Sequence, residues 1–426
     1  MSEADSRSLW RRYRSIPVFY RIMASLVLGA VVGLTVGEPA GKLKPLGDVL
    51  VRLLKMVVIP IVFLTLVMGL RQIQPSKLGR VGTQTVGAYL ITTSIAIVFG
   101  LGVANVVDPG TGVSLPEGAE AMEKTPPGLS EVFLNIFPLN PIGAMAEGNV
   151  LQTIFFAIVF GIGLAFVQKE SEEGSVVHEG TKTLFSVIEA AAEVMFKIVW
   201  GIMEYAVIGV FALMAWAFGT TGPDLIISFG KLILALTVAI AVHIGFTYLL
   251  IIVMALDRES PVEFLTGAKE AITTAFAIRS SSGTLPVTMS NAEDHLKIDE
   301  EIYSFTLPLG ATINMDGTAM YQGVGAIFAA NLMGVNLTIG QQFTVLATAV
   351  LASVGTAGVP GSGLIMLTLV LTQLGFPLEI IGFVAGIDPI LDRLRTMNNV
   401  TGDLAVSTLI GKWNEAIDFE SGVWSS

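Results

Sequence analysis

The chain has 426 residues, of which 53% are hydrophobic and only 14% are charged, whereas soluble globular proteins carry about 25% charged residues. With a mean hydropathy of +0.73, this composition excludes an ordinary soluble domain and indicates a polytopic α-helical membrane protein. The continuous apolar runs exclude a β-barrel, whose strands alternate polar and apolar residues. The net charge of −11 gives no reason to expect a nucleic-acid partner, and the lack of cysteine excludes disulfides and thiolate chemistry.

Apolar runs that meet the requirement of about 20 residues for crossing a bilayer recur along the chain. We expect eight transmembrane helices, at 17–37, 46–70, 82–107, 129–167, 183–218, 225–256, 299–334 and 376–411. Arg11, Arg12 and Arg14 precede the first span, and no signal-peptide cleavage site follows it. The N-terminus is therefore expected in the cytoplasm, and an even number of spans returns the C-terminus there. The expected location is the cell membrane, plasma or inner.

Two further segments are apolar but interrupted at their centres by small and hydroxylic residues. The first, 259–292, is interrupted at 279–284 (RSSSGT), and the second, 338–375, is interrupted at 355–363 (GTAGVPGSG). Their arms of about 11–20 residues are mostly too short to cross a bilayer, and Gly and Pro break helices. We expect two re-entrant helical hairpins, which are typical of transporter sites. The second tip is either a lid that folds over a ligand or a buried loop.

The last span carries a polar stripe, because steps of three and four residues return to one helix face. Its members are Asp388, Asp392, Arg395, Thr396, Asn399 and Asp403. A guanidinium suits a carboxylate, and an aspartate one turn away suits an ammonium group. Asp388 and Asp403 remain as hard oxygen ligands for alkali cations. We favour a site for charged cargo; the alternative, an ion-pair ladder, leaves unpaired buried charge.

The stretch 314–318 (NMDGT) places Asp316 in the middle of the seventh span, between Gly310 and Gly317. Carbonyls freed by these glycines, with a carboxylate and an amide, would form an oxygen cage. The alternative is an aspartate that caps a local helix break.

Two weaker signals are hydroxyl clusters. The serines at 280–282 are expected at a hairpin tip beside a helix N-terminus, which suits an anionic group, although such a run is usually only a turn. Tyr89, Thr92 and Thr93 lie on one turn of the third span, where hydroxyls often bond back to their own helix.

Four ordered motifs, RSSSGT, NMDGT, GTAGVPGSG and DPILDRLRTMNNVTGD, resemble the dicarboxylate/amino acid:cation symporter family, and within it the prokaryotic sodium-coupled aspartate and glutamate transporters. The resemblance implies an all-α glutamate-transporter-like fold, with eight transmembrane helices plus two re-entrant helical hairpins. It also implies a homotrimer in membrane lipid, with a scaffold formed by 1–81 and 129–222. An elevator-type transport domain would be formed by 82–128 and 223–426.

The resemblance also assigns site residues. Contacts with the substrate are implied for Arg279, Ser281, Thr318, Val359, Gly363, Asp392, Arg395, Thr396 and Asn399. A first sodium site would use Gly310, Asn314, Asn399 and Asp403. A second would use Thr312, Ser353, Val354 and Thr356, largely through carbonyls. A third would use Tyr89, Thr92, Thr93, Asn314 and Asp316.

These assignments predict a transporter, not an enzyme, that couples sodium entry to uptake of L-aspartate or L-glutamate and needs no organic cofactor. Arg395 is typical of members with acidic substrates, Asp392 indicates an amino group, and Asp403 indicates sodium coupling. Gln322 replaces the Glu of proton-countertransporting members, so no proton or potassium countertransport is expected. The alternatives are a proton- or sodium-coupled dicarboxylate symporter, or an anion channel of the same fold.

Two features depart from the family pattern. Arg279 and Arg393 are both present, whereas members typically have one of the two, and each could approach Asp392 or face elsewhere. Glu204 is an unusual charge in the fifth span, for which a hydrogen bond at a trimer interface is a hypothesis.

Overall fold

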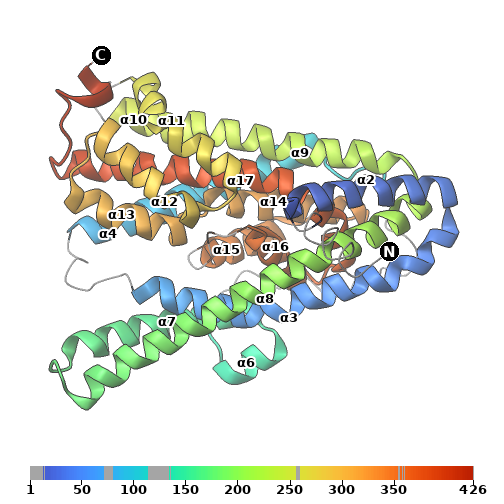
Figure 1. Ribbon diagram of the computed structural model, residues 1–426, viewed down its shortest axis with the longest axis horizontal. Coiled ribbons are helices and arrows are strands. Elements are labelled where there is room, and N and C mark those ends of the chain that lie inside the picture. The colour runs from blue at the N-terminus through green and yellow to red at the C-terminus, as the bar shows by residue number, and fades with distance from the viewer. Residues whose placement is uncertain are drawn as a thin grey trace, which may run out of the picture.

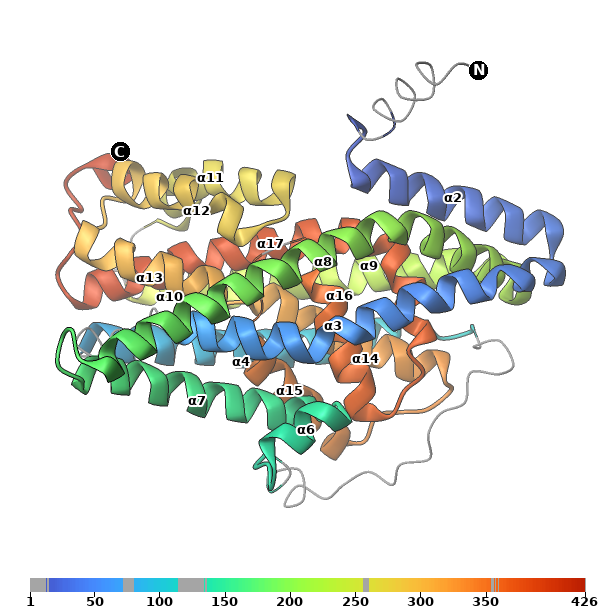
Figure 2. The same ribbon diagram turned by 60° about the horizontal axis from the view of Figure 1, so that its bottom comes forward.

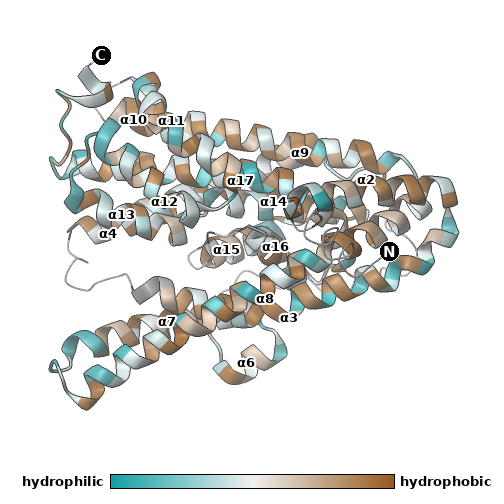
Figure 3. Cartoon of the chain, in the orientation of Figure 1, coloured by the Kyte–Doolittle hydropathy of each residue, from teal (hydrophilic) through white to brown (hydrophobic). Residues whose placement is uncertain are grey.

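The computed structural model describes residue 13 and residues 15–71, 80–113, 134, 136–255, 260–353, 356, 358 and 360–425. Within these ranges every regular element is a helix, and the only extended pairing is a bridge between Ile298 and Ile417. The expectation of an all-α chain is confirmed for this part. Figure 1 shows long helices that run roughly along one axis, and Figure 3 shows that they are mostly apolar, with hydrophilic residues at many turns and also within helices such as α17.

The first group of helices forms one packed unit. Figure 2 shows α3, α7 and α8 side by side, and α2 packs along α8. Small residues allow this approach, because a Cβ at Gly29 would lie 2.5 Å from the Phe211 carbonyl oxygen. The elements up to residue 221, all but α4 part of this unit, are α2 (Val18–Val36), η1 (Glu38–Leu43), α3 (Lys44–Arg71), α4 (Arg80–Val107), α6 (Pro141–Glu147), α7 (Val150–Glu170) and α8 (Val176–Thr221).

The second half is arranged around its last long helix, α17, which contacts α9, α11, α13 and α14 and also reaches α2, α3 and α8. α4 belongs with this half, since it packs on α9 and α14. The elements are α9 (Asp224–His243), the π-helix η2 (Ile244–Leu249), α10 (Leu250–Ala255), α11 (Pro261–Ile278), α12 (Ser281–Ser290), η3 (Asn291–His295), α13 (Glu300–Ile313), α14 (Asp316–Leu332), α15 (Ile339–Ser353), α16 (Ser362–Leu374), α17 (Glu379–Trp413) and η4 (Gly422–Ser425).

Five stretches of helix in the described residues are long and apolar enough to cross a membrane. They are Glu38–Met68, Arg80–Val107, Gln152–Glu170, Val176–Thr221 and Asp224–Met254. The apolar stretch of the first expected span is shorter (Tyr20–Val36), the seventh is divided into α13 and α14, and α17 carries the polar stripe. A membrane protein with several spans follows, and the count of eight stays a prediction.

Two expected boundaries are corrected. The fourth span is expected as one helix over 129–167. Residues 129–133 and 135 lie outside the described residues, and the rest of this range is not a single helix. Instead Gly148, in the left-handed region (φ +76°), ends α6, and α7 begins anew at Val150. The fifth span, expected at 183–218, is the 46-residue helix α8, which begins earlier because Ser175 caps its N-terminus.

Both interrupted segments form pairs of packed helices. Hairpin 1 (α11 and α12) turns at Arg279 and Ser280, and in hairpin 2 (α15 and α16) the first helix ends at Ser353 and the second begins at Ser362. Their surroundings differ: α16 is buried against α3, whereas Phe276 and Ile278 of α11 are each 43% exposed. In both views α11 lies across α17 from α3 and α7.

The C-terminal residues 414–425, here the C-terminal clasp, fold back over the end of hairpin 1. The Ala416 carbonyl accepts from the Asp299 amide at 3.0 Å, and the Asp418 amide donates to the Lys297 carbonyl at 3.1 Å. Trp424 is buried and donates from Nε1 to the Leu296 carbonyl at 2.8 Å. The chain end is thereby tied to the junction between α12 and α13.

Glu204 has a partner within the chain, so the hypothesis of a trimer-interface bond is not needed to account for it. Arg21 on α2 donates to both of its carboxylate oxygens, at 2.6 and 2.8 Å. This two-point ion pair joins α2 to α8.

Candidate functional site

The polar stripe of α17 lies inside the protein. None of its members is more than 5% exposed: Asp388, Asp392, Arg395, Thr396, Asn399 and Asp403. A buried charge is costly unless it is paired or binds a ligand, so the partners of each group decide what the stripe can do.

Arg395 is the centre of the first cluster. Its Nη1 donates to Asp388 Oδ1 and its Nη2 to Asp392 Oδ1, each at 2.8 Å, and its Cζ lies 4.1 Å from the centre of the Tyr321 ring. Gly363 of α16 closes over the guanidinium, since a Cβ there would lie 2.6 Å from Nη2. The expectation that Asp388 serves an alkali cation is corrected, because its Oδ1 pairs with an arginine two turns along the same helix face.

Three buried polar atoms of this cluster have no hydrogen-bond partner: Asp392 Oδ2, Arg395 Nε and the Tyr321 hydroxyl. Buried polar atoms are nearly always hydrogen-bonded, so these three are candidate contacts for a ligand. Asp392 Oδ2 can accept from an ammonium group, and the other two atoms can donate to a carboxylate.

The structure separates the two arginines that the sequence left ambiguous. Arg279 approaches the cluster, with Nη1 3.9 Å from Asp392 Oδ2, an ion-pair contact longer than a hydrogen bond. Arg393 faces away from Asp392 and donates from Nη1 to the carbonyls of Phe276 and Ala277, at 2.8 and 2.9 Å.

The tips of the two hairpins meet beside this cluster. Ser280 caps α12 by accepting from the Gly283 amide at 2.9 Å, and its hydroxyl donates to the Gly358 carbonyl at 2.6 Å. Ser281 begins α12 and is 3% exposed, as expected for a serine run at a helix N-terminus. Thr318 is also buried, in the first turn of α14.

A second cluster surrounds Asp403. Asn314 Nδ2 donates to Asp403 Oδ1 at 2.9 Å and lies 3.4 Å from the Asn399 carbonyl. Gly310 faces the same point, because a Cβ there would lie 2.5 Å from Asp403 Oδ1 and 2.6 Å from the Tyr89 hydroxyl. The structure thus brings together the residues of the first predicted sodium set.

A third cluster surrounds Asp316. The Thr93 hydroxyl donates to Oδ1 and the Tyr248 hydroxyl donates to Oδ2 at 2.6 Å. His243 Nε2 lies 3.9 Å from Oδ2, and Thr92 Oγ1 lies 3.5 Å from the Asn314 side-chain oxygen of the second cluster. The hydrogen bonds of the Asp316 carboxylate thus join α14 to α4 and η2, and none of them goes to a backbone amide of its own helix, as a local cap would require.

The helix break beside Asp316 does not occur at a glycine. α13 ends at Ile313 and α14 begins at Asp316, so the break is at Asn314 and Met315. Gly317 allows close packing instead, because a Cβ there would lie 2.8 Å from the Arg395 Cα.

The second predicted sodium set is not joined by hydrogen bonds in the described part of the chain. Thr312, Ser353 and Thr356 each donate to a carbonyl of their own chain segment, at 2.7 to 3.0 Å. Val354 of this set, and Val359 of the substrate set, lie outside the described residues.

Two contacts of Asp316 were missed by the sequence reasoning. Tyr248 and His243 come from the junction of α9 with the π-helix η2. A π-helical turn contains more residues than an α-helical turn, so it changes the direction in which the side chains point. The sequence signal that could have indicated these contacts was His243, an ionisable residue inside an apolar span. No group of three His, Cys, Asp or Glu residues fit to hold a metal occurs in the ranges that the structure covers. The clusters instead mix carboxylate, amide, hydroxyl and carbonyl oxygens.

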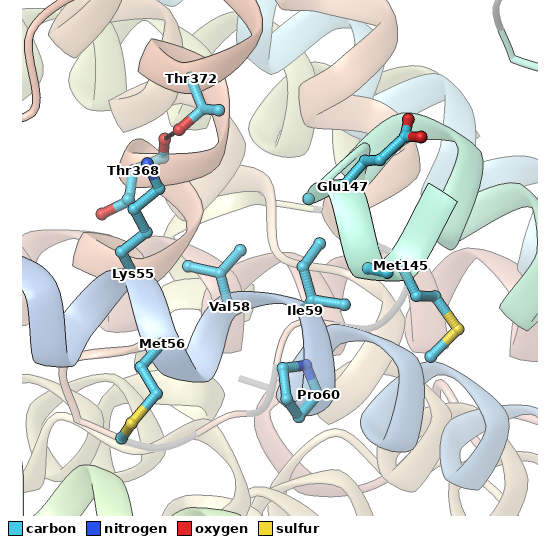
Figure 4. A pocket seen from close by; sticks show the side chains of 11 residues that line it. Lys55, Met56, Val58, Ile59, Pro60, Met145, Glu147, Thr368 and Thr372 are labelled. Atoms are coloured by element: carbon cyan, nitrogen blue, oxygen red, sulfur yellow. Dashed lines mark hydrogen bonds between the residues drawn. The ribbon is translucent and has the colours of Figure 1, made fainter. Parts of the chain in front are cut away.

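A cavity of about 400 Å³ lies elsewhere, between α3, α6 and α16. Figure 4 shows Lys55 extending from α3 and Glu147 on α6 across the cavity. None of the predicted site residues lines it, so its size does not make it the candidate site. We place that site at the three clusters around Arg395, Asp403 and Asp316.

Comparison with known proteins identifies the family of the chain. The Sodium:dicarboxylate symporter family matches residues 18–413. The proton/sodium-glutamate symport protein of Bacillus subtilis (strain 168) is 34% identical over 410 residues, covering 92% of each chain. The proton/glutamate-aspartate symporter of Escherichia coli (strain K12) is 32% identical, covering 94% of this chain and 93% of its own. The C4-dicarboxylate transport protein of Bacillus subtilis is 30% identical, covering 93% and 94%. The chain therefore belongs to the Sodium:dicarboxylate symporter family.

Proposed function

We propose that this protein is a secondary active transporter that couples sodium entry to the uptake of L-aspartate or L-glutamate. The observation that carries the proposal is a buried guanidinium fork, Arg395, beside a carboxylate oxygen of Asp392 that has no hydrogen-bond partner. An acidic amino acid has the matching groups, a side-chain carboxylate for Arg395 Nε and the Tyr321 hydroxyl, and an ammonium group for Asp392 Oδ2. The glutamate and aspartate named for two relatives agree with this choice.

Charge balance supports coupling to cations. Four buried carboxylates face two guanidinium groups, a formal excess of two negative charges: Asp316, Asp388, Asp392 and Asp403 against Arg279 and Arg395. Carrying this excess through hydrocarbon is unfavourable, and sodium ions bound around Asp403 and Asp316 cancel it. Relatives are named for protons as well as sodium, and the mixed oxygen groups of these clusters favour the metal ion.

The transport movement belongs to the same proposal. The transport domain comprises 82–128 and 223–426 and moves as an elevator against a scaffold of 1–81 and 129–222, within a homotrimer whose N- and C-termini are cytoplasmic. Two re-entrant hairpins enclose the site, and the second sodium set joins Thr312 of α13 to Ser353, Val354 and Thr356 of the second interrupted segment. In support, α16 and α17 make most of the contacts with α2, α3 and α8, whereas Phe276 and Ile278 on the outer side of α11 are exposed.

Uptake of a dicarboxylate without an amino group is the second candidate, favoured by the similarity to a C4-dicarboxylate transport protein. Asp392 argues against it, because such a substrate leaves Oδ2 buried without a hydrogen-bond donor.

The experiment is uptake of labelled aspartate into proteoliposomes under an inward sodium gradient, a proton gradient, or neither. We expect accumulation with the sodium gradient, and competition by aspartate or glutamate but not by serine. Asp392→Asn should lose aspartate uptake, while Asp418→Asn, which alters an exposed carboxylate of the C-terminal clasp, serves as the control. Accumulation driven by a proton gradient alone would show that sodium is not the coupling ion. Competition by succinate equal to that by aspartate would favour uptake of a dicarboxylate without an amino group.

A further inference from the structure

We propose that Arg393 is a positioning residue, which holds the tip of hairpin 1 so that Arg279 competes with the substrate ammonium group for Asp392. The proposal rests on the function proposed above and deepens it, since it names the residue that sets how strongly an amino group is preferred.

The contacts of Arg393 define a clamp. Nη1 donates to the carbonyls of Phe276 and Ala277, and Cζ lies 5.7 Å from the centre of the Phe276 ring. These carbonyls belong to the last turn of α11, where helix geometry leaves carbonyl groups without intrahelical partners. An arginine at this end also complements the negative pole of the helix.

The clamp lies directly before the strained point of the tip. Arg279 follows α11 in the left-handed region, with φ +58°, a conformation that side chains other than glycine seldom adopt. Such a conformation persists only where neighbouring contacts hold it. Because Arg393 fixes the residues two and three positions earlier, it determines the direction in which the Arg279 side chain leaves the tip.

Adjacent positions on α17 connect the clamp to the site. Arg393 and Asp392 are neighbours in a helix, so their side chains diverge by about 100°. One reaches the backbone of α11 and the other points into the arginine cluster, where Arg279 Nη1 stands 3.9 Å from Oδ2. That oxygen is the atom to which the substrate ammonium would bind. A cation held beside it weakens ammonium binding and assists release.

The test is a double-mutant cycle with aspartate and succinate as competitors for sodium-driven uptake. Arg393→Met should release the tip and raise the preference for aspartate over succinate roughly threefold to fivefold, the range of a partly exposed ion pair. Arg393→Lys, which can still donate to both carbonyls, should restore the original preference. Arg279→Gln should give the same rise by itself, and adding Arg393→Met to it should change nothing more.

Arg80→Met is the matched control, because Arg80 also donates to a distant backbone carbonyl, that of Trp413, outside the site. An additive effect of the two substitutions, or an unchanged preference in Arg279→Gln, would overturn the proposal. Arg279→Gln leaves the clamp intact, so it decides the matter even if Arg393→Met does not fold. If the wild-type protein accumulates aspartate while the preference never changes, only this inference fails; if it accumulates no acidic amino acid, both proposals fail.

Discussion

At the scale of single residues, the site is governed by the cost of buried charge. Arg395 is 1% exposed and has two carboxylate partners. The attraction between the guanidinium and the two carboxylates offsets the free-energy cost of removing all three groups from water. Removing one member therefore does more than delete a contact, because it leaves the others uncompensated.

Arg395→Cys should abolish uptake of acidic amino acids. Truncating one partner of a buried, hydrogen-bonded charge pair costs about 2–5 kcal/mol of binding free energy, which corresponds to roughly a thirtyfold or greater loss of affinity. Calorimetric titration with aspartate and uptake into proteoliposomes measure this loss. Arg80→Cys, at an exposed position, is the control, and full retention of aspartate uptake by Arg395→Cys would refute the assigned carboxylate partner.

Asp403→Asn should weaken the dependence of aspartate binding on sodium. The substitution keeps the shape of the second cluster but removes the charge that the Asn314 amide contacts at 2.9 Å. Because ions that favour the loaded state raise substrate affinity, removing one ion site lowers the slope of affinity against sodium concentration. Calorimetry over a series of sodium concentrations gives this slope; an equal slope in wild type and variant contradicts the site.

At the scale of elements, hairpin 1 is anchored at both ends. Its tip is bonded to hairpin 2 through Gly358 and clamped by Arg393, and its far end is covered by the C-terminal clasp. Gly267 of α11 shows how close this cover is, since a Cβ there would lie 3.2 Å from a methyl carbon of Val423.

Trp424→Ala should destabilise the protein. Truncating a buried Trp typically costs about 3–5 kcal/mol, and the bond to the Leu296 carbonyl is lost as well. A lower unfolding temperature and faster proteolysis of the C-terminal residues are expected. Trp413→Ala is the matched control because that side chain is 45% exposed; equal unfolding temperatures for both variants would show that the clasp contributes no stability.

At the scale of the whole molecule, the two groups of helices meet along close-packed glycines of α17. A Cβ at Gly386 would lie 2.6 Å from a methyl carbon of Leu26, and one at Gly382 would lie 3.0 Å from Leu213 Cγ. Because close-packed interiors are stiff, any movement between the two groups of helices at this seam has to be a movement of rigid bodies.

The elevator proposal predicts that a disulfide across this seam stops transport. The chain has no cysteine, so Leu213→Cys with Gly382→Cys introduces a single possible bridge, at two positions that are in contact across the seam. After oxidation, uptake should fall to background and recover with reductant, while aspartate binding persists. Each single cysteine variant is a control, and undiminished uptake by the cross-linked protein would rule out sliding along this seam.

Much of the fold could be predicted from the sequence because it depends on local patterns. Apolar length predicted the helices, and Gly, Pro and Ser clusters predicted both interrupted segments, since these residues act on their own backbone. The polar stripe of α17 could be predicted because its members are separated by steps of three and four along one helix. The family followed from the order of four motifs, which needs no coordinates.

Partnerships between distant segments were decided only by the tertiary structure. Asp388 against Arg395, Arg279 rather than Arg393 near Asp392, and Tyr248 on Asp316 all depend on how each helix is rotated and how closely it approaches its neighbours. Glu204, unexplained by its own span, is paired with Arg21, 183 residues away along the chain. Periodicity determines which face of a helix is polar, but not what lies opposite, because that is set by the packing of the whole chain.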